Sequence, residues 1–478
     1  MVRHMKILVY LVKVSFLERS LRQAYRKLTF SDYKISGYGP KIAYILMLIA
    51  SKLGVVTSLR ELYLSGKVSK PNDTTPSKLY DAHVLHLSMN RVYDLPDVEV
   101  SLQRKKTVNV LVPAFDFASI SAGFFGVFQV ARYFKTCGHN VRLVLFDNFY
   151  FNLAEFEKKF QSYPGMENLF TELEIEYIGD RKSPLQISSD DVCIATVWYS
   201  AYFARKITEY TTPKKFVYLI QDYESAFFPG GSFFSLAEAT YSFDYFALFS
   251  SESLMNYFLN NDIGGIRKRE LYYIFFNNAC SAKLLSKEEF FKINKTKNKR
   301  KLVFYSRPIV NRNMFELTAL AIAEAFNRGI LDPDKWDCIG MGLGDAKVQM
   351  ESGITSTVLP RMNLKEYIDK VAEFDICVTL MASPHPSMIP MDLAGSGAIV
   401  VTNTFHTKTS SYFSSISRNI ISSPPTLPDL LDAIAKAAIR CEDIASRYEN
   451  AQGMNYPRNW SEVFGPSHRD FVSLALKN

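Results

Sequence analysis

The 478-residue sequence has few cysteines, and none of them form a close pair. Without a C-x-x-C pair, the sequence lacks the spacing of a thioredoxin-like redox motif and of a common type of zinc site. We expect free thiols, packed mainly as small hydrophobic side chains in a reducing compartment. The six, with no C-x-x-C spacing between any two of them, are Cys137, Cys193, Cys280, Cys338, Cys377 and Cys441.

Several other signatures are missing. There is no G-x-G-x-x-G fingerprint, so a nicotinamide-binding function loses support. Lys13 interrupts the apolar start and no small-residue cleavage site follows it, so we expect no secretory signal. A D-x-D pair, Asp332 and Asp334, precedes the strand predicted at Trp336 and is therefore at the wrong end of a sheet for a ligand. We expect no metal and no cofactor.

The positive charge is concentrated at one end of the chain. Residues 1–70 carry 13 Lys or Arg and 3 acids, whereas residues 71–478 carry 43 Lys or Arg and 45 acids. A nucleic-acid-binding body would carry its own basic surface, so we expect no nucleic-acid partner. Residues 14–28 have the spacing of a basic amphipathic helix, and residues 42–59 are apolar except for Lys52. Residues 1–70 are thus predicted to lie on an anionic membrane surface, or alternatively to pack on the body.

Residues 107–455 show a βα pattern that occurs twice. After a linker at residues 71–106, apolar runs at 107–113, 141–146, 191–198, 216–220 and 245–250 alternate with helical stretches, which gives a first domain at 107–285. A Lys-rich interdomain linker at 286–300 precedes a second domain at 301–455, and a helix in residues 456–478 returns to the first domain. The predicted fold is α/β, with two Rossmann-like doubly wound domains facing a cleft.

Ligands of open parallel sheets bind at the carboxyl ends of the strands, so residues that follow each run are site candidates. The glycines that open the first long helix, Gly123 among them, permit close approach of a ligand. Asp222 and Glu224 are suited to general-base work or to binding sugar hydroxyls, although Glu224 can instead cap the following turn. The residues expected to bind a ligand on the first-domain side, the acceptor in a group-transfer reaction, are Gly123, Trp198, Tyr199, Gln221 and Tyr223.

The second half carries an ordered set of motifs: F-Y-S-R-P at 304–308, N-R-N at 311–313, L-P-R-M-N-L-K-E-Y at 359–367, and a stretch starting S-P-H-P-S at 383–403. With Q-D-Y-E at 221–224, this order resembles the GT-B glycosyltransferases of the large retaining family that uses nucleotide-sugar donors. The residues of these motifs are most similar to those of rhamnosyltransferases that assemble bacterial surface glycans, such as S-layer glycans. The resemblance covers about residues 107–475.

The resemblance implies specific roles. Arg307 and Arg312 would bind the donor diphosphate as bidentate cations, and His385 would donate to a phosphate or a sugar hydroxyl. The other implied donor-binding residues are Asn313, Arg361, Ser383, Ser387 and Asp392. Two departures stand out: Asp392 replaces a Glu expected at the ribose, and Pro384 and His385 replace the first acid of the family's acidic pair.

The resemblance implies retention of the anomeric configuration, for which no protein nucleophile need be present. The donor phosphate can take the acceptor proton while Asp222 or Glu224 orients the acceptor, so the expected catalytic set is Asp222, Glu224, Arg307 and His385, with no firm general base. The implied reaction moves a sugar, L-rhamnose from dTDP-rhamnose, onto a lipid-linked glycan at the inner face of the bacterial cytoplasmic membrane. Two alternatives stay open: a donor carrying another sugar on UDP or GDP, and a catalytically inactive glycan-binding scaffold.

Overall fold

The computed structural model describes residues 89–477, except residues 115–121, 162, 164, 270, 343–345, 352, 354 and 361. The basic module expected at residues 1–70 and the donor contact expected at Arg361 therefore lie outside the described residues. The chain divides into two compact units, Met1–Leu95 and Pro96–Asn478. The first unit contributes one short described helix, α5 (Asn90–Tyr93), and everything below concerns the second.

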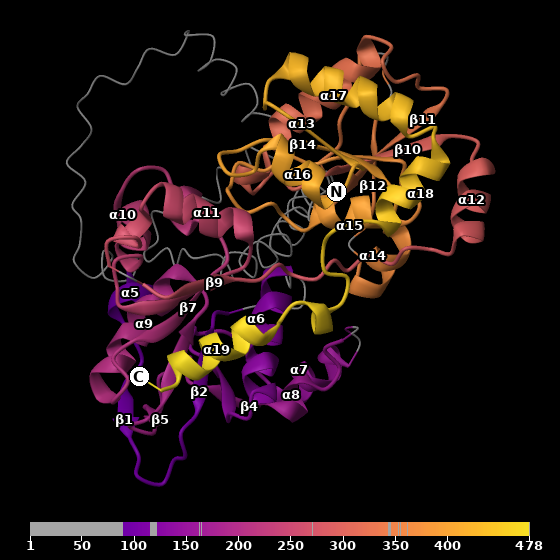
Figure 1. Ribbon diagram of the computed structural model, residues 1–478. Helices are drawn as coiled ribbons and strands as arrows, with labels where there is room; N and C mark the ends of the chain where they lie inside the picture. Colours follow the sequence, from indigo (N-terminus) through magenta and orange to yellow (C-terminus); the bar gives the residue numbers. More distant parts are fainter. Residues whose placement is uncertain are drawn as a thin grey trace, which may run out of the picture. The chain divides into compact units, whose positions relative to one another are not determined.

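The first domain is built on a seven-stranded parallel sheet (Figure 1). Its strand order is β4-β3-β2-β6-β7-β8-β9, the doubly wound order in which two halves of the sheet run outward from a central switch point. Every residue of β2, β3, β6, β7 and β8 is buried, as expected for strands covered on both faces. The strands are β2 (Val108–Val112), β3 (Val141–Leu145), β4 (Glu174–Tyr177), β6 (Val192–Ala195), β7 (Phe216–Ile220), β8 (Tyr245–Phe249) and β9 (Tyr273–Phe275).

Helices connect these strands, and a separate parallel pair flanks the sheet. The pair consists of β1 (Val98–Val100) and β5 (Leu185–Ile187). The helices are α6 (Ala122–Thr136), α7 (Leu153–Phe160), α8 (Leu169–Glu172), α9 (Trp198–Tyr210), α10 (Ser232–Thr240) and α11 (Glu252–Asn260). Short 3₁₀ turns lie at η1 (Glu224–Phe227) and η2 (Ile263–Gly265).

The second domain repeats the architecture with six parallel strands in the order β12-β11-β10-β13-β14-β15. Alternate residues of β10 belong to different cores: Leu302 and Phe304 join the core that includes residues of α13 and α17, and Val303 joins the core on the other face. The strands are β10 (Arg300–Tyr305), β11 (Trp336–Met341), β12 (Thr357–Val358), β13 (Ile376–Val378), β14 (Ile399–Asn403) and β15 (Ile420–Ser423). The helical elements are η3 (Asn311–Asn313), α13 (Phe315–Asn327), α14 (Leu364–Val371), α15 (Ile389–Gly395), α16 (Ser410–Ile416), α17 (Leu427–Arg440) and α18 (Ile444–Gln452).

The α/β class and the two doubly wound sheets predicted from the sequence are confirmed. One segment differs from its description as a linker. Within residues 286–300, Ser286 caps helix α12 (Lys287–Lys295) through a capping box with Glu289. The buried ring of Phe290 packs against Tyr448 of α18, so this Lys-rich stretch forms part of the second domain. In the sequence, the surrounding lysines obscure the two apolar residues, Phe290 and Phe291, on which this helix packs.

After α18 the chain runs back to the first domain. The turn η4 (Trp460–Glu462) leads to α19 (Pro466–Ala475), which lies beside the first domain in Figure 1. Phe471 and Val472 belong to the core of the first domain, and Phe464 stacks on Tyr133 of α6 at 4.3 Å between ring centroids. The chain thus crosses between the two domains twice, once after β9 and once after α18.

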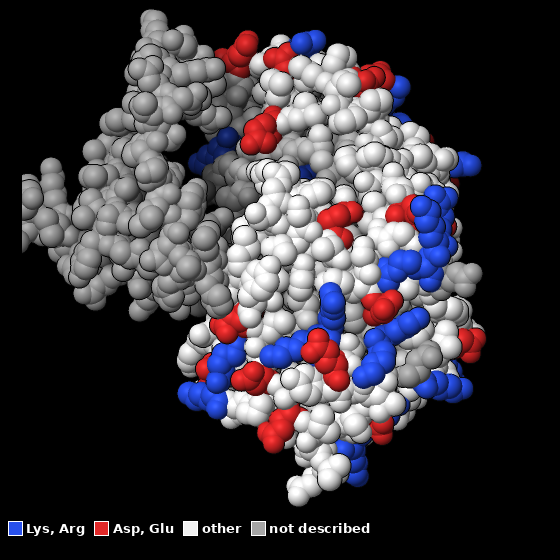
Figure 2. Space-filling model, turned by 90° about the vertical axis from the view of Figure 1, so that its left-hand side faces the viewer, with Lys and Arg blue, Asp and Glu red and all other residues white. Residues whose placement is uncertain are grey.

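The surface of the described residues carries charges of both signs, interspersed on the face shown in Figure 2. This matches the near balance of charge in residues 71–478. No described helix is both long and apolar enough to cross a bilayer. All six cysteines are free, and five of them are buried.

A buried ionic cluster holds the second domain together at the start of β13. The Asp375 carboxylate is fully buried and lies 2.9 Å from Arg447 Nη1 and 3.0 Å from Lys297 Nζ. Burial alone would raise the pKa of Asp375, but the charges of Arg447 and Lys297 hold it below its ordinary value. Arg447 also donates to the carbonyl oxygens of Gly397 and Cys441. One guanidinium therefore ties α18 to the residues just ahead of β13 and β14 and, through Asn294, to α12.

We predict that Arg447→Leu lowers the free energy of unfolding by about 3–5 kcal/mol, because it leaves the Asp375 carboxylate buried with less compensating charge. The matched control is Arg328→Leu, which breaks only the surface pair with Glu324 and should cost less than about 1 kcal/mol. Urea denaturation of both variants measures the difference. Equal loss in the two variants would show that the cluster does not stabilise the domain.

Candidate active site

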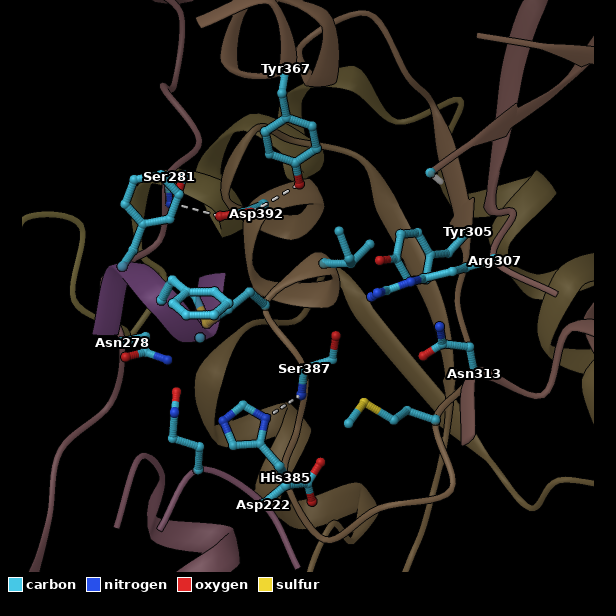
Figure 3. Close-up of a pocket in the computed structure, with 18 of the residues that line it drawn as sticks. Asp222, Asn278, Ser281, Tyr305, Arg307, Asn313, Tyr367, His385, Ser387 and Asp392 are labelled. Atoms are coloured by element: carbon cyan, nitrogen blue, oxygen red, sulfur yellow. Dashed lines mark hydrogen bonds between the residues drawn. The ribbon is translucent and has the colours of Figure 1, made fainter. Parts of the chain in front are cut away.

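A cavity of about 820 Å³ opens between the two sheets, at the carboxyl ends of their strands (Figure 3). From the first domain it is lined by residues that follow β6 and β7, such as Thr196 and Gln221, and from the second by residues that follow β10 and β11. Gly342, just after β11, has a φ of +144°, and a Cβ there would lie only 2.5 Å from the Ser306 carbonyl oxygen. Both sheets thus direct their ligand-binding ends at the same space.

One wall of the cavity presents hydrogen-bond donors that the protein does not use. Arg307 and Arg312 follow β10, and Asn313 ends η3 just before α13. The Nε atoms of both arginines and the Nδ2 atom of Asn313 are buried, and no described residue accepts a hydrogen bond from them. A buried donor left without a partner costs about 1–3 kcal/mol. Cationic and amide N–H groups gathered on one wall are therefore suited to bind an anion.

Asp222, which follows β7 of the first domain, reaches across to the second. Its Oδ1 accepts a hydrogen bond from the Ser383 hydroxyl, and its Oδ2 lies 3.8 Å from Arg312 Nε. The Arg312 guanidinium also sits 4.1 Å above the ring centre of Phe227, another first-domain residue. The wall of hydrogen-bond donors formed by Arg307, Arg312 and Asn313 is called the donor wall below. The side chain of Arg312 in this wall is therefore positioned by two groups of the first domain.

The loop between β13 and α15 is held in a constrained shape next to Asp222. Ser387 has a φ of +65°, a left-handed conformation that is uncommon for serine, and its N–H donates to His385 Nδ1 at 3.1 Å. The His385 N–H in turn donates to Ser383 Oγ. Because Nδ1 accepts, the ring proton of the neutral imidazole is on Nε2.

The His385 imidazole is neutral at physiological pH. Burial lowers the pKa of His385 to about 4, and the charges of Lys408 and Arg312 act in the same direction, whereas Asp222 and a hydrogen bond with the Ser250 backbone oppose them. The ring is thus a hydrogen-bond donor at Nε2 and a poor general base. Because Nδ1 accepts from Ser387, the hydrogen bond with the Ser250 backbone uses the Nε2 proton, and the donor role toward a ligand expected for His385 stays a prediction.

Lys408 is a charged residue of this region that the sequence analysis missed. It is completely buried, and its Nζ donates to the Met381 carbonyl oxygen at 2.8 Å. Burial lowers the pKa of Lys408 to about 7, while Asp222 opposes that shift. Lys408 follows β14 after a short turn, and only the three-dimensional fold brings it near Asp222.

Glu224 lines the cavity, yet its carboxylate also has a structural contact. Its Oε2 accepts from the Trp198 N–H at the start of α9, so Glu224 caps that helix. The pKa of Glu224 is raised to about 8, chiefly by burial and in part by the neighbouring Asp222, while the Trp198 N–H and Arg312 act in the opposite direction. At neutral pH Glu224 is therefore mostly protonated and unsuited to act as a base.

Asp392, expected at the ribose, lies on α15 with both carboxylate oxygens engaged. Oδ1 accepts from the Ser281 N–H at 2.7 Å and Oδ2 from the Tyr367 hydroxyl at 2.9 Å, as the dashed lines in Figure 3 show. Burial raises the pKa of Asp392 to about 6. The side chain still lines the cavity, so a ribose contact would use the remaining lone pairs of these oxygens.

The structure brings ten of the expected site residues to the cavity wall: Gly123, Gln221, Asp222, Glu224, Arg307, Arg312, Asn313, His385, Ser387 and Asp392. Ser383 is buried next to the wall through its bond to Asp222. Three expected acceptor contacts need correction, because their rings do not line the cavity. Trp198 packs edge-on against Tyr202 and Phe228, the Tyr199 hydroxyl donates to Asp147, and the Tyr223 hydroxyl donates to Glu238.

Other wall residues were missed by the sequence analysis. Phe124, Phe125 and Tyr163 add aromatic surface on the first-domain side. Asn278, which follows β9, is buried, and no described residue donates to its Oδ1. The run Tyr272–Phe276 ahead of it has the composition of a strand and would have marked this position.

Comparison with known proteins agrees with the geometry. Residues 107–252 match the family model described as "WsaF, N-terminal domain", and residues 300–435 match "WsaF, C-terminal domain". The fold is GT-B, and these similarities support a glycosyltransferase of that fold. The chain carries both domains of the WsaF family, which together span more than half of its length.

Individual relatives are more distant. The "O-antigen biosynthesis protein RfbC" of Myxococcus xanthus is 26% identical over 254 residues, which cover 52% of this chain and 18% of that protein. The chain thus matches less than a fifth of the length of this relative. Among solved structures, Anabaena HepE in complex with UDP-glucose has a TM-score of 0.53 at 12% identity, covering 78% of this chain and 100% of that one. The GtfA/B complex has a TM-score of 0.51 at 10% identity, with the same coverage.

We predict that Glu224→Gln gains stability relative to the native protein as the pH rises. Below pH 4.5, the ordinary pKa of Glu, the carboxyl is protonated in both the folded and unfolded states. Between pH 4.5 and about 8 only the folded state holds the proton, so the stability of the native protein falls as the pH increases. The amide of the variant accepts from the Trp198 N–H without titrating.

Melting temperatures measured from pH 5 to pH 9 test this prediction. The difference between Glu224→Gln and the native protein should grow toward high pH. Glu449→Gln, at an exposed position of α18, controls for the loss of one carboxylate. A constant difference across the range would contradict a buried, protonated Glu224.

Proposed function

We propose that the protein is a glycosyltransferase that moves a sugar, L-rhamnose from dTDP-rhamnose, onto a growing, lipid-linked bacterial cell-surface polysaccharide. Support for a surface glycan comes from the similarity to a protein named for O-antigen biosynthesis. Support for a nucleotide-sugar donor comes from the likeness in fold to HepE, whose structure was solved with UDP-glucose. The choice of rhamnose rests on the sequence motifs at residues 221–224 and 383–403.

The observation that carries the proposal is the wall of unpartnered donors formed by Arg307, Arg312 and Asn313. When the bond between sugar and diphosphate breaks, negative charge grows on the leaving phosphate. Fixed donors that point at this charge in a site shielded from water stabilise the transition state more than the ground state. Arginine suits the task because its fork can bind two phosphate oxygens.

The titratable groups favour transfer of the acceptor's hydroxyl proton to the phosphate of the nucleotide-sugar donor. Glu224 is mostly protonated at neutral pH, and His385 accepts at Nδ1 from the protein, so neither is available as a base. Asp222 accepts a hydrogen bond from Ser383 and lies near Arg312, so its role is to orient the acceptor and not to take a proton. The departing phosphate oxygen then takes the proton of the acceptor hydroxyl, and the new bond forms on the same face of the sugar.

The first-domain side of the cavity fits a carbohydrate acceptor. Aromatic rings of Phe124, Phe125 and Tyr163 offer apolar surface for sugar rings, and Gln221 offers hydrogen bonds for hydroxyls. The basic residues 1–70 would hold the enzyme at the inner face of the cytoplasmic membrane, where a lipid-linked acceptor is found. No metal enters this scheme, because the two arginines supply the positive charge at the diphosphate.

The alternative donor is a UDP-linked hexose, because the solved relative binds UDP-glucose. A catalytically inactive glycan-binding scaffold is the third candidate from the sequence. It is disfavoured by the N–H groups of Arg307, Arg312 and Asn313 that lack hydrogen-bond acceptors, since a scaffold gains nothing from keeping such groups ready for a phosphate.

We predict that dTDP raises the melting temperature more than UDP or GDP does. At a hundredfold excess over its Kd, a ligand that binds only the folded state adds about 2.7 kcal/mol of stability. Thermal shift assays with the three nucleotides measure the order. A stronger effect of UDP would favour the alternative donor, and no shift with any nucleotide would favour the scaffold.

We further predict that Arg307→Ala lowers the transfer rate from dTDP-rhamnose by about 10²–10³-fold, while Asp222→Asn retains most of the activity. The asparagine can still accept from Ser383 but cannot take a proton. Steady-state assays with purified lipid-linked acceptor give both values. If Asp222→Asn is as inactive as Arg307→Ala, the Asp222 carboxylate, and not the leaving phosphate, takes the proton of the acceptor hydroxyl.

A further inference from the structure

A second groove, of about 470 Å³, lies where the chain crosses between the domains, and it shares no lining residue with the active-site cavity. We call it the crossover groove. The two crossing segments are joined there, since the Cys280 N–H donates to the Pro457 carbonyl oxygen, and the Asn455 N–H donates to the carbonyl oxygen of Ile416 in α16. The groove is lined by Glu252, Phe275, Asn277, Tyr412, Ser415, Ile416, Met454, Asn455, Tyr456, Pro457 and Glu462.

Two buried polar atoms at this groove lack partners. No described residue bonds to the Tyr412 hydroxyl or to Asn277 Oδ1. The first can donate and accept, and the second accepts. Because each unpartnered buried group is costly, two of them in one groove indicate a ligand that carries both donors and acceptors.

The charge of the groove narrows the class of ligand. Its charged lining residues are Glu252 and Glu462, and no Lys or Arg is among those that line it. Anionic ligands such as nucleotides and phosphates are therefore disfavoured. Carboxylates accept from hydroxyl groups, and the rings of Phe275, Tyr412 and Tyr456 supply apolar faces of the kind that pack against sugar rings.

We propose that the crossover groove is a second carbohydrate site, which binds a neutral segment of the glycan outside the active-site cavity. This inference rests on the proposed function in that it takes a glycan to be the substrate. A chain held in the groove would stay with the enzyme after each addition. Asn277 lines the groove and the next residue, Asn278, lines the cavity, so one short segment contacts both.

Hydrogen–deuterium exchange of the full-length protein, with and without millimolar rhamnotetraose, tests the site. Bound glycan should protect residues 410–416 and 454–457. Tyr412→Phe removes only the unpartnered hydroxyl, so it should fold normally and weaken this protection, with up to about a tenfold loss of affinity. Asn277→Ala should do the same. Tyr210→Phe, at an exposed position of α9, and Asn278→Ala, which alters the cavity instead, should leave the protection unchanged.

The results separate this inference from the proposed function. Absence of protection in these two peptides, or full protection in Tyr412→Phe, overturns the second site. If dTDP stabilises the protein while the peptides stay unprotected, only the second site fails. If the peptides are protected while no nucleotide binds, the groove is a carbohydrate site and the transferase proposal fails.

Discussion

The carboxylate of Asp222 is the point at which the two domains share one site. It belongs to the first domain, yet its two oxygens face Ser383 and Arg312 of the second. The Arg312 backbone is tied to its own domain, because its carbonyl oxygen accepts from the Ala382 N–H. The side chain of Arg312 is thus oriented by one domain and anchored by the other. Any separation of the domains would therefore disorganise the donor wall as well as open the cavity.

Burial determines which charges around Asp222 persist. Glu224 loses its charge at neutral pH because it is desolvated beside another acid, and His385 stays neutral because it is desolvated near two cations. Arg307 and Arg312 keep their charge, since a guanidinium is not deprotonated in proteins. The cavity is thereby left with positive charge at the donor wall and few competing bases, which suits a substrate that brings its own negative charge and its own proton acceptor.

The sequence predicts this fold well because each parallel strand is a short apolar run that alternates with a helix, and the position of Asp222 and Arg307 follows from the strand ends. It predicts side-chain direction less well. Trp198 and Tyr199 do follow a strand, but α9 begins at Trp198 and turns both rings into the first-domain core. The position of Lys408 near Asp222 depends on long-range packing and no local pattern marks it, whereas the strand-like run Tyr272–Phe276 would have marked Asn278.

The crossing segment after β9 joins features that are distant in the sequence. Asn277 lines the crossover groove, Asn278 lines the cavity, and the Ser281 N–H donates to Asp392 on α15. The same Asp392 accepts from Tyr367 of α14, so the segment is linked to two helices of the second domain. A carboxylate one methylene shorter than Glu reaches less far into the cavity, and it is instead held by the backbone of this segment. Movement of the segment would then shift Asn278 and Asp392 together, because both are attached to the same few residues of chain.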